Sequence, residues 1–380
     1  MPDPPPPPRR ATHLRVGIAA VLIAASLWLA HDQAHRWLPA AVDLARALPG
    51  VGFGRMHRLE QAVLNGLDRL ERLGAGPAPQ ARPVRPPPRA LDPLWPPAPL
   101  TPLLDPPMDG EGAWRPAGAP CLEAVDGEAP LMVRTALRVD PERPEVHVSL
   151  VAMDLRRLSL DVIAGTADGG SGRVAPSPAV VATFNGAFQS RHGRFGLMSG
   201  GRTLLPPSPG AATVAMDAQG RVALDAWPEG EAGEVVALRQ NLQLLQEGAR
   251  VEPQLSLVAD GRREVIGHSV TRRSGLCVRP PGTLIYVWTQ RGRAEALGRA
   301  MVAAGCHRGM HLDLNAFHTY FEFVAVADGV EGWEGACTAR LERRMTDSPR
   351  GRYLTTQERD FFVVTRRQAP LGDPVWRLGE

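Results

Sequence analysis

Three polar residues, His311, Asp313 and Asn315, are spaced by two in the C-terminal third of the chain. On a strand their side chains would share one face, because side chains alternate between the two faces. The leucines between them would then face the core. A carboxylate beside an imidazole can supply the base and acid of a hydrolysis. We therefore expect Asp313 to act as general base or electrostatic stabiliser, and His311 or His318 as proton donor to the leaving group.

Two other interpretations of this cluster remain open. His307, His311, Asp313 and His318 offer the nitrogen and oxygen ligands that a metal site uses. Alternatively, the polar residues form the solvated face of an edge strand. We favour a ligand-facing site, and we expect neither a metal nor an organic cofactor.

A second group of polar residues follows an apolar run, Pro178–Phe184, that suits a buried strand. The amide of Asn185 could bind a phosphate or a sugar hydroxyl, with the Gly186 N–H beside it. A simpler interpretation is an Asn-Gly turn that needs a left-handed conformation. Farther along, the planar guanidinium of Arg273 could pair with a phosphodiester oxygen, whereas the adjacent Arg272 would face the opposite way.

In their order along the chain, these motifs resemble those of the phosphodiester glycosidase family. That family has an Asn-Gly-Gly-Phe turn after a buried strand, then a glycine-rich stretch, an arginine segment, a helix ending in glycine, and Asn-Leu-Asp-Gly-Gly-Gly-Ser-Thr. The resemblance runs from about Pro130 to Thr365, and the matching segments are Phe184–Phe188, Gly193–Gly201, Arg273–Leu276 and His311–Thr319.

The resemblance, together with the polar cluster described above, gives a set of expected site residues. The expected catalytic residues are Asp313, His311 and His318, and the expected substrate-binding residues are Asn185, Gly186, Phe188, Gly196, Arg273, Asn315 and Thr319. In the last motif Leu314, Asn315 and Ala316 replace the three glycines, which let a backbone approach a ligand closely. A sugar or phosphate would therefore have to bind differently here. Asp154 matches an early family aspartate, but a turn-forming structural role is simpler.

Strand patterns dominate the region that must position these residues, from Gly112 onward. The expected strands are Leu131–Val139, Val146–Met153, Leu158–Ala164, Pro178–Phe184, two within Leu276–Thr289, Met310–Leu314, Tyr320–Ala327 and Asp360–Thr365. Arg293–Ala304 has helical spacing, and Gly305 stands where a C-terminal cap belongs. We predict an α+β fold with a central mixed β-sheet packed with a few helices.

The N-terminal third differs in composition. The apolar stretch Val16–Ala30 after three arginines predicts a membrane anchor or a signal peptide within residues 1–31. Residues 32–73 have helix-like leucine spacing and suggest a stalk. Prolines then crowd residues 74–111, which predicts a semi-rigid linker. The working domain would be residues 112–380, exported across the bacterial inner membrane to which the chain is attached.

The cysteines depend on that location. In an oxidising compartment Cys121, Cys277, Cys306 and Cys337 could form one or two disulfides. Cys121 with Cys337 is the preferred pair, whereas the strand-like surroundings of Cys277 favour a buried free thiol. The net charge of +3 comes with scattered arginines and no lysine, which argues against nucleic-acid binding.

Two functions fit these features. The first is an envelope hydrolase that cleaves a sugar–phosphate diester or a related glycan. The second is an inactive relative that binds a glycan or a protein. The altered glycine motif favours the second, whereas Asn185, Arg273 and Asp313 together favour the first.

Overall fold

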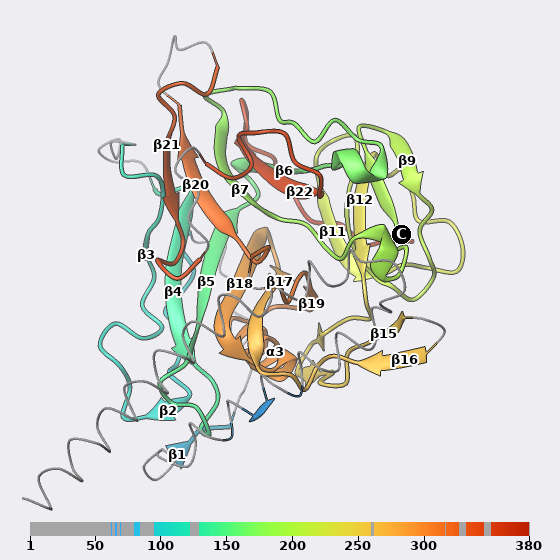
Figure 1. Cartoon of the computed structure of the whole chain (residues 1–380). Coiled ribbons are helices and arrows are strands. Elements are labelled where there is room, and N and C mark those ends of the chain that lie inside the picture. The colour runs from blue at the N-terminus through green and yellow to red at the C-terminus, as the bar shows by residue number, and fades with distance from the viewer. Residues whose placement is uncertain are drawn as a thin grey trace, which may run out of the picture. The chain divides into compact units, whose positions relative to one another are not determined.

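The structure is a computed structural model, and it describes residues 62, 65, 66, 69, 80–83, 95–121, 129–259, 262–315, 317–326, 332–345 and 351–379 (Figure 1). The chain divides into two compact units, residues 1–67 and 68–380. The expected anchor lies outside the described residues, and so does the expected stalk apart from four helical residues. Among the residues described, no helix is long and apolar enough to cross a membrane.

The second unit is an α+β domain made mostly of antiparallel sheets (Figure 1). Its largest sheet has eight strands in the order β14-β13-β19-β17-β18-β5-β4-β3. These strands are β3 (Arg115–Pro116), β4 (Met132–Arg138), β5 (His147–Asp154), β13 (Gln246–Glu247), β14 (Arg250–Val251), β17 (Thr271–Arg279), β18 (Thr283–Gly292) and β19 (Arg308–His311).

Two five-stranded sheets complete the core of the domain. One has the order β21-β20-β7-β22-β6, formed by β6 (Leu158–Ile163), β7 (Val180–Asn185), β20 (Phe321–Ala325), β21 (Cys337–Arg340) and β22 (Phe361–Arg366). The other has the order β11-β10-β12-β8-β9, formed by β8 (Leu197–Ser199), β9 (Arg202–Leu205), β10 (Ala212–Met216), β11 (Val222–Ala226) and β12 (Ala237–Asn241).

Smaller elements surround these sheets. They are the pair β1 (Gln80–Ala81) and β2 (Leu104–Asp105), the hairpin β15 (Ser256–Ala259) and β16 (Arg262–Val265), the 3₁₀ turns Thr166–Asp168 and Ser190–His192, and the helix α3 (Ala294–Ala303). The helix buries an apolar face that includes Leu297 and Met301, and it ends before Gly305, whose φ is +76°. Between named strands of the described region every pairing is antiparallel. Parallel pairing, which a mixed sheet would contain, occurs there as an isolated bridge between Val222 on β11 and Val375.

Aromatic residues join the eight-stranded sheet to the β7 sheet. The ring of Phe184 on β7 lies 5.2 Å from that of Tyr286 on β18, 5.6 Å from Phe321 and 5.0 Å from Phe362, measured between centroids. All four side chains are fully buried. Since these rings come from four different strands, their burial fixes how the two sheets stack and where the C-terminal end of β7 lies.

Part of the proline-rich segment, which we predict to be a semi-rigid linker, packs on the domain. Leu100, Leu103 and Leu104 are buried. The backbone N–H of Leu100 donates to the carbonyl of Gly112 at 2.9 Å, and that of Gly112 donates to Ala136 on β4 at 3.1 Å. Residues from about 95 to 111 therefore pack on the domain, because their leucines can be buried there and a proline has no backbone N–H that must find an acceptor.

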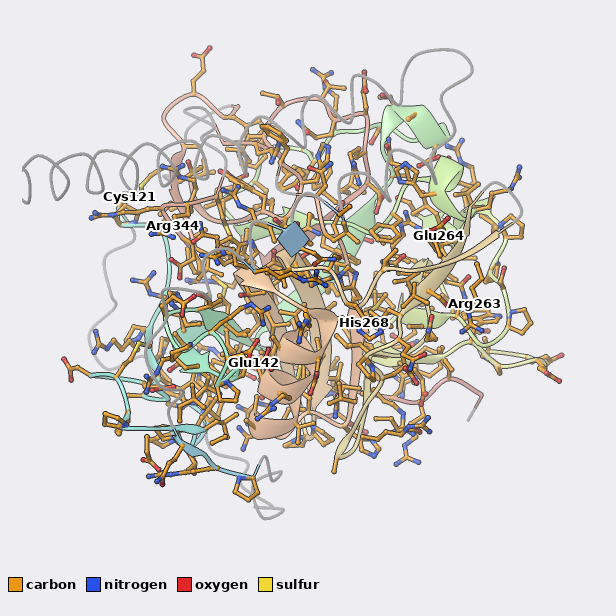
Figure 2. The ribbon with its side chains drawn as sticks, turned by 60° about the horizontal axis from the view of Figure 1, so that its bottom comes forward. Cys121, Glu142, Arg263, Glu264, His268 and Arg344 are labelled. Carbon is orange, nitrogen blue, oxygen red and sulfur yellow. A yellow bond between two sulfur atoms is a disulfide. The ribbon has the colours of Figure 1, made fainter. Side chains whose placement is uncertain are left out.

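The four cysteines form two disulfides. Cys121 is bonded to Cys337, as expected, and joins the segment before β4 to β21. Cys277 on β17 is bonded to Cys306 after α3, so the prediction of a free thiol there was wrong. The strand pattern correctly placed Cys277 in the interior, but it could not show that the helix returns its own cysteine to the same strand. Figure 2 shows Cys121 near the edge of the domain.

Candidate active site

A small polar cavity opens where β7 ends. Its volume is about 260 Å³. It is lined by Asn185, Gly186, Ala187, Asp313, His318, Arg352, Tyr353, Thr356, Gln357, Glu358, Arg359 and Asp360. Two of the three segments that meet here, at residues 185–187 and 313–318, were expected from the sequence to form the site. The third, residues 352–360, was not.

Asn185 is buried and its side chain is fully engaged. Its Nδ2 donates to the Gly186 carbonyl at 2.8 Å and to Ser274 Oγ at 3.0 Å. Its Oδ1 accepts from the Tyr286 hydroxyl at 2.9 Å and from the Tyr320 backbone N–H at 3.0 Å. Asn185 thus ties together β7, β17, β18 and the start of β20, and its main contribution is to hold the cavity's floor in place.

Asp313 reaches the cavity because the strand pairing is irregular beside it. The Ser274 N–H donates to the Asp313 carbonyl at 2.9 Å, while the Leu312 N–H donates to the Ser274 carbonyl at 2.9 Å. Two residues therefore oppose one across the ladder, which is a β-bulge. The bulge breaks the alternation after His311. Consequently His311 and Asp313 do not share a face, contrary to the expectation from their spacing.

The Asp313 carboxylate is held by several donors. Oδ2 forms an ion pair with Arg359 at 2.6 Å, and Oδ1 accepts backbone N–H groups of Leu314 at 2.7 Å and Asn315 at 3.0 Å. Asp313 is 3% exposed, which still leaves it at the cavity wall. A carboxylate fixed in this way has a defined direction, as a catalytic group requires.

Two arginines give the cavity its positive side. Arg359 pairs with Asp313, as described. Arg352 donates to the Phe317 carbonyl, and its guanidinium lies 5.2 Å from the centroid of the Tyr320 ring. Guanidinium groups bind phosphate oxygens through paired N–H donors. The cavity therefore combines a carboxylate with two groups that suit a phosphodiester.

A buried carboxylate anchors the segment that carries these arginines. Glu322 on β20 is fully buried, and it accepts the backbone N–H groups of Arg352 at 3.0 Å and Tyr353 at 3.1 Å. The Thr183 hydroxyl also donates to it, at 2.9 Å. Burial raises the pKa of Tyr353 well above its ordinary value, so its hydroxyl stays protonated at the cavity wall. Glu322 thereby fixes where Arg352 and Tyr353 enter the site.

A second buried ion pair shapes the loop after β7. Arg239 on β12 and Asp360 are both fully buried side chains, and Nε lies 2.8 Å from Oδ2. Arg239 also donates to the carbonyls of Phe188, Phe195 at 3.1 Å and Gly196 at 3.4 Å. Phe188 and Gly196, expected to bind substrate, are thus held by Arg239 in the loop behind the cavity and do not line it.

Arg273 and His311 lie together outside the cavity. Both are fully buried. Nη1 of Arg273 is 3.1 Å from Nε2 of His311, and the other guanidinium nitrogens donate to the carbonyls of Ile266, Ser269 and Gly292. Burial lowers the pKa of Arg273 to about 9.

His311 is held neutral in this environment. Burial, and then the charge of Arg273, lowers the pKa of His311 well below its ordinary value. Its ring packs edge-on to Phe188, with centroids 5.9 Å apart. Neither Arg273 nor His311 lines the cavity, so the expected roles in substrate binding and proton donation have no support in their positions. Arg273 instead fastens the turn at 266–269 to the sheet, and His311 packs against Arg273 and Phe188.

The remaining expected residues divide between lining and support. His318 lines the cavity. Asn315 accepts the Phe317 N–H on its Oδ1 at 2.8 Å, and its carbonyl accepts from His318 and Thr319 at 3.0 Å each. Asn315 therefore caps the turn that presents His318. Thr319 is buried and is not among the lining residues.

The structure does not bring the candidate metal ligands together. In the described part of the chain, no group of three or more His, Cys, Asp or Glu side chains is placed to hold a metal ion. His307 lines a different cavity, and His311 lies on the opposite face from Asp313. The four candidate ligands therefore do not converge.

Four charged residues at or beside the cavity were not predicted from the sequence: Arg352, Arg359, Asp360 and Arg239. One signal was available: the charged run Glu358-Arg359-Asp360 immediately precedes the apolar strand β22. Charged residues at the end of a buried strand are frequent in sites. Arg239 gave no such signal, since it lies within the short strand β12, next to the polar residues Gln240 and Asn241.

The chain matches no protein-family model and no curated protein sequence. Among solved structures, it is similar to the catalytic domain of zebrafish N-acetylglucosamine-1-phosphodiester alpha-N-acetylglucosaminidase, auto-inhibited by its pro-peptide, at 12% identity and a TM-score of 0.39. That match covers 64% of this chain and 85% of the other. An uncharacterised Synechocystis protein matches at 10% identity and TM-score 0.36, covering 62% of each chain.

A third similar structure is a Burkholderia pseudomallei protein described as exported. It matches at 10% identity and TM-score 0.31, covering 58% of this chain and 74% of the other. These likenesses are distant and concern the fold alone.

Proposed function

We propose that this domain is a hydrolase of the phosphodiester glycosidase type, acting on a sugar–phosphate diester or a related glycan. The observation that carries the proposal is the 260 Å³ cavity in which Asp313 and His318 lie with Arg352 and Arg359. Such a site can bind the phosphate, stabilise positive charge near the anomeric carbon and protonate a leaving group.

Each residue then has a defined task. Arg352 and Arg359 bind the non-bridging oxygens of the phosphodiester. Asp313 stabilises the positive charge that develops at the sugar, or accepts a proton from water. When a phosphate takes part of the Arg359 guanidinium, the Asp313 carboxylate is released from its ion pair toward the substrate. His318 donates the proton to the leaving group, and Asn185 keeps this geometry in place.

The proposed location is the cell envelope, with the domain exported and tethered to the inner membrane. The apolar stretch Val16–Ala30 supports a tether. The two disulfides support an oxidising compartment, because such bonds are rare in the cytosol. Fractionation of cells expressing the full chain tests this: recovery in the cytosolic fraction would contradict it.

A binding role without catalysis is the second candidate. One observation favours it: both oxygens of Asp313 already have protein partners, and Leu314 and Asn315 stand where the family has glycine. The experiment that separates the two uses the purified full chain and the p-nitrophenyl phosphodiester of N-acetylglucosamine 1-phosphate. Release of free sugar, measured by chromatography, supports the hydrolase. Saturable binding without release supports the binding module, and absence of both contradicts the assignment of this cavity.

A further inference from the structure

The chain has three tyrosines, Tyr286, Tyr320 and Tyr353, and the structure buries all three. Two of their hydroxyls hold parts of the fold together. The Tyr286 hydroxyl donates to Asn185 Oδ1 at 2.9 Å, and the Tyr320 hydroxyl donates to Glu322 Oε2 at 3.2 Å. A buried tyrosine hydroxyl ordinarily finds such a partner, because leaving it without one is unfavourable.

The hydroxyl of Tyr353 differs from the other two. Its backbone N–H donates to Glu322 at 3.1 Å, but no residue that the structure describes forms a hydrogen bond with the hydroxyl. Tyr353 is 5% exposed and lines the cavity beside Asp313. The hydroxyl oxygen is not sealed from solvent, so it faces the cavity. A ligand there can supply the partner that the protein does not.

The packing of the Tyr353 ring accounts for an aromatic residue but not for its hydroxyl. The ring stacks on Phe361, with centroids 4.7 Å apart and planes at 18°, and it lies edge-on to Tyr320 at 5.9 Å. A phenylalanine would make both contacts without the cost of a hydroxyl that lacks a partner. The packed ring also fixes the direction of the hydroxyl, which reduces the entropy lost when a ligand binds.

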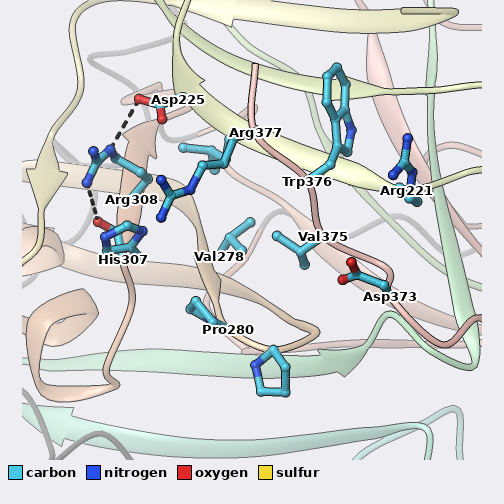
Figure 3. Close-up of a pocket in the computed structure, with 12 residues that line it drawn as sticks. Arg221, Asp225, Val278, Pro280, His307, Arg308, Asp373, Val375, Trp376 and Arg377 are labelled. Carbon is cyan, nitrogen blue, oxygen red and sulfur yellow. Dashed lines mark hydrogen bonds and ion pairs between the residues drawn. The ribbon is translucent and has the colours of Figure 1, made fainter. Parts of the chain in front are cut away.

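The larger cavity of the domain, of about 520 Å³, differs in this respect (Figure 3). Arg308 is ion-paired there with Asp225 at 3.2 Å and with Glu247 at 3.0 Å. The Arg221 guanidinium lies over the Trp376 ring, 5.9 Å from its centroid. These side chains already interact with the protein, so the smaller cavity offers the clearer contact for a ligand.

The protonation of Tyr353 limits what its hydroxyl can do. Burial raises the pKa of Tyr353 above its ordinary value, so the hydroxyl stays neutral and protonated at physiological pH. A group with a raised pKa is a poor proton donor to a leaving group, since an efficient acid has a pKa near the working pH. The hydroxyl can still donate a hydrogen bond, and such bonds are strongest when the acceptor is an anionic oxygen.

The charges on the cavity wall nearly balance. Two ion pairs neutralise four of them: Asp313 with Arg359 at 2.6 Å and Asp360 with Arg239 at 2.8 Å. Arg352 forms no ion pair with another described residue, and the carboxylate of the exposed Glu358 also lines the cavity. With His318 neutral, the wall has no excess of positive charge. It therefore suits a singly charged group better than a doubly charged one.

From these features we propose that Tyr353 binds substrate, its hydroxyl donating to one non-bridging phosphate oxygen while Arg352 donates to the other, and that the pair selects a singly charged phosphodiester over a doubly charged monoester. This role rests on the proposed function, because both concern the same cavity. The two non-bridging oxygens of a diester share one negative charge, which one cation and one neutral donor match. The monoester left after cleavage gains a second charge near neutral pH, so its release is favoured.

Isothermal titration calorimetry with the full chain tests the charge preference. The probes are C-glycosidic phosphonates of glucose, mannose and N-acetylglucosamine, in which a methylene replaces the oxygen that hydrolysis would break. Each is used at pH 8.5 as the singly charged methyl ester and as the doubly charged free phosphonate. We expect at least one ester to bind more tightly than its free phosphonate. Equal or tighter binding of the free phosphonate overturns the selectivity, and no binding by any ester overturns the role of Tyr353.

A matched pair of variants tests the hydroxyl. Tyr353→Phe should weaken binding of the ester about tenfold or more, and its melting temperature should not fall, because no protein contact is lost. Tyr320→Phe is the control: it should lower the melting temperature, since Glu322 loses a donor, and weaken binding less. Equal losses of stability and affinity in both variants would make Tyr353 structural and overturn the proposal.

The same variants separate this role from hydrolysis. Unchanged affinity in folded Tyr353→Phe overturns the role of the hydroxyl, while sugar release from the p-nitrophenyl phosphodiester by the unmodified chain would still support the hydrolase. Conversely, weakened binding in Tyr353→Phe without sugar release by the unmodified chain supports Tyr353 as a binding residue and contradicts hydrolysis.

Discussion

Gly186 and Asp360 are in such close contact that a β-carbon on Gly186 would lie 1.8 Å from Asp360 Oδ2. That oxygen also accepts the Ala187 N–H at 3.1 Å and pairs with Arg239 at 2.8 Å. The glycine after Asn185 is therefore required by a buried carboxylate, which connects the turn at the end of β7 to the strand that begins at Phe361.

Gly186→Ala should destabilise the domain by about 1–3 kcal/mol, because the new methyl group must displace the Asp360 carboxylate or the turn. Chemical denaturation followed by circular dichroism measures this. Gly230→Ala is the matched control, since no atom lies within 4 Å of a β-carbon placed there. Equal effects of the two substitutions would show that the Asp360 contact is unimportant.

Asp313→Asn should lower turnover of the phosphodiester on the order of a hundredfold to ten-thousandfold if the domain is a hydrolase. The amide oxygen can still accept the two backbone N–H groups, so the fold should persist while the negative charge is lost. Steady-state kinetics with a parallel melting curve measures both effects. Asp109→Asn, at an exposed position, is the control. Full turnover in a folded Asp313→Asn protein would exclude Asp313 from the chemistry.

His311 should make the domain less stable in mild acid. Its pKa in the folded state is well below its ordinary value, whereas the unfolded chain takes up a proton near pH 6.5. The contribution of the neutral His311 to the free energy of unfolding is therefore complete above about pH 6.5. Below that, stability falls by up to about 1.4 kcal/mol per pH unit until the folded-state pKa is reached.

Denaturation midpoints at pH 7.5 and 5.5 measure this dependence. His311→Gln, which cannot take up the proton, should show a smaller difference between the two pH values than the unmodified chain. His268→Gln serves as control because His268 is exposed. An identical pH dependence in all three proteins would remove His311 as the source.

The two disulfides should differ in their response to a reductant. Cys277 and Cys306 are buried, whereas Cys121 is exposed and Cys337 half-buried. Thiol–disulfide exchange requires access to a sulfur. Mild reduction of the folded chain followed by alkylation and peptide mass spectrometry should therefore label Cys121 and Cys337 first. Under denaturing conditions all four should be labelled together. Earlier labelling of Cys277 in the folded chain would contradict the structure.

Much of the fold could be predicted from hydrophobic pattern and turn chemistry. The expected strand Leu158–Ala164 corresponds to β6, the pair within Leu276–Thr289 to β17 and β18, and the expected helix Arg293–Ala304 to α3. Long apolar or alternating runs gave these elements. Between about 197 and 265 no strand was expected, because those strands are short and separated by glycine- and proline-containing turns.

The site was harder to predict because its geometry depends on pairing. The two-residue spacing of His311 and Asp313 suggested one face, but the bulge opposite Ser274 turns Asp313 away from His311. Sequence spacing alone cannot reveal this bulge, because it is defined by which residues pair with Ser274 on the neighbouring strand. Likewise, the segment 352–360, which carries Arg352 and Arg359, is held at the cavity in part by Glu322 on β20, which binds its backbone.

The position of β22 has a consequence for how the chain can be made. This strand, Phe361–Arg366, lies between β6 and β7, and it pairs with both. Synthesis proceeds from the N-terminus at roughly 5–20 residues per second. After β7 emerges, it waits on the order of ten seconds or more for its neighbour. During that interval two apolar strands have unpaired edges that can associate with other chains. A growing chain of this sequence thus needs protection until β22 has been made, and premature termination before Phe361 would leave the sheet permanently open.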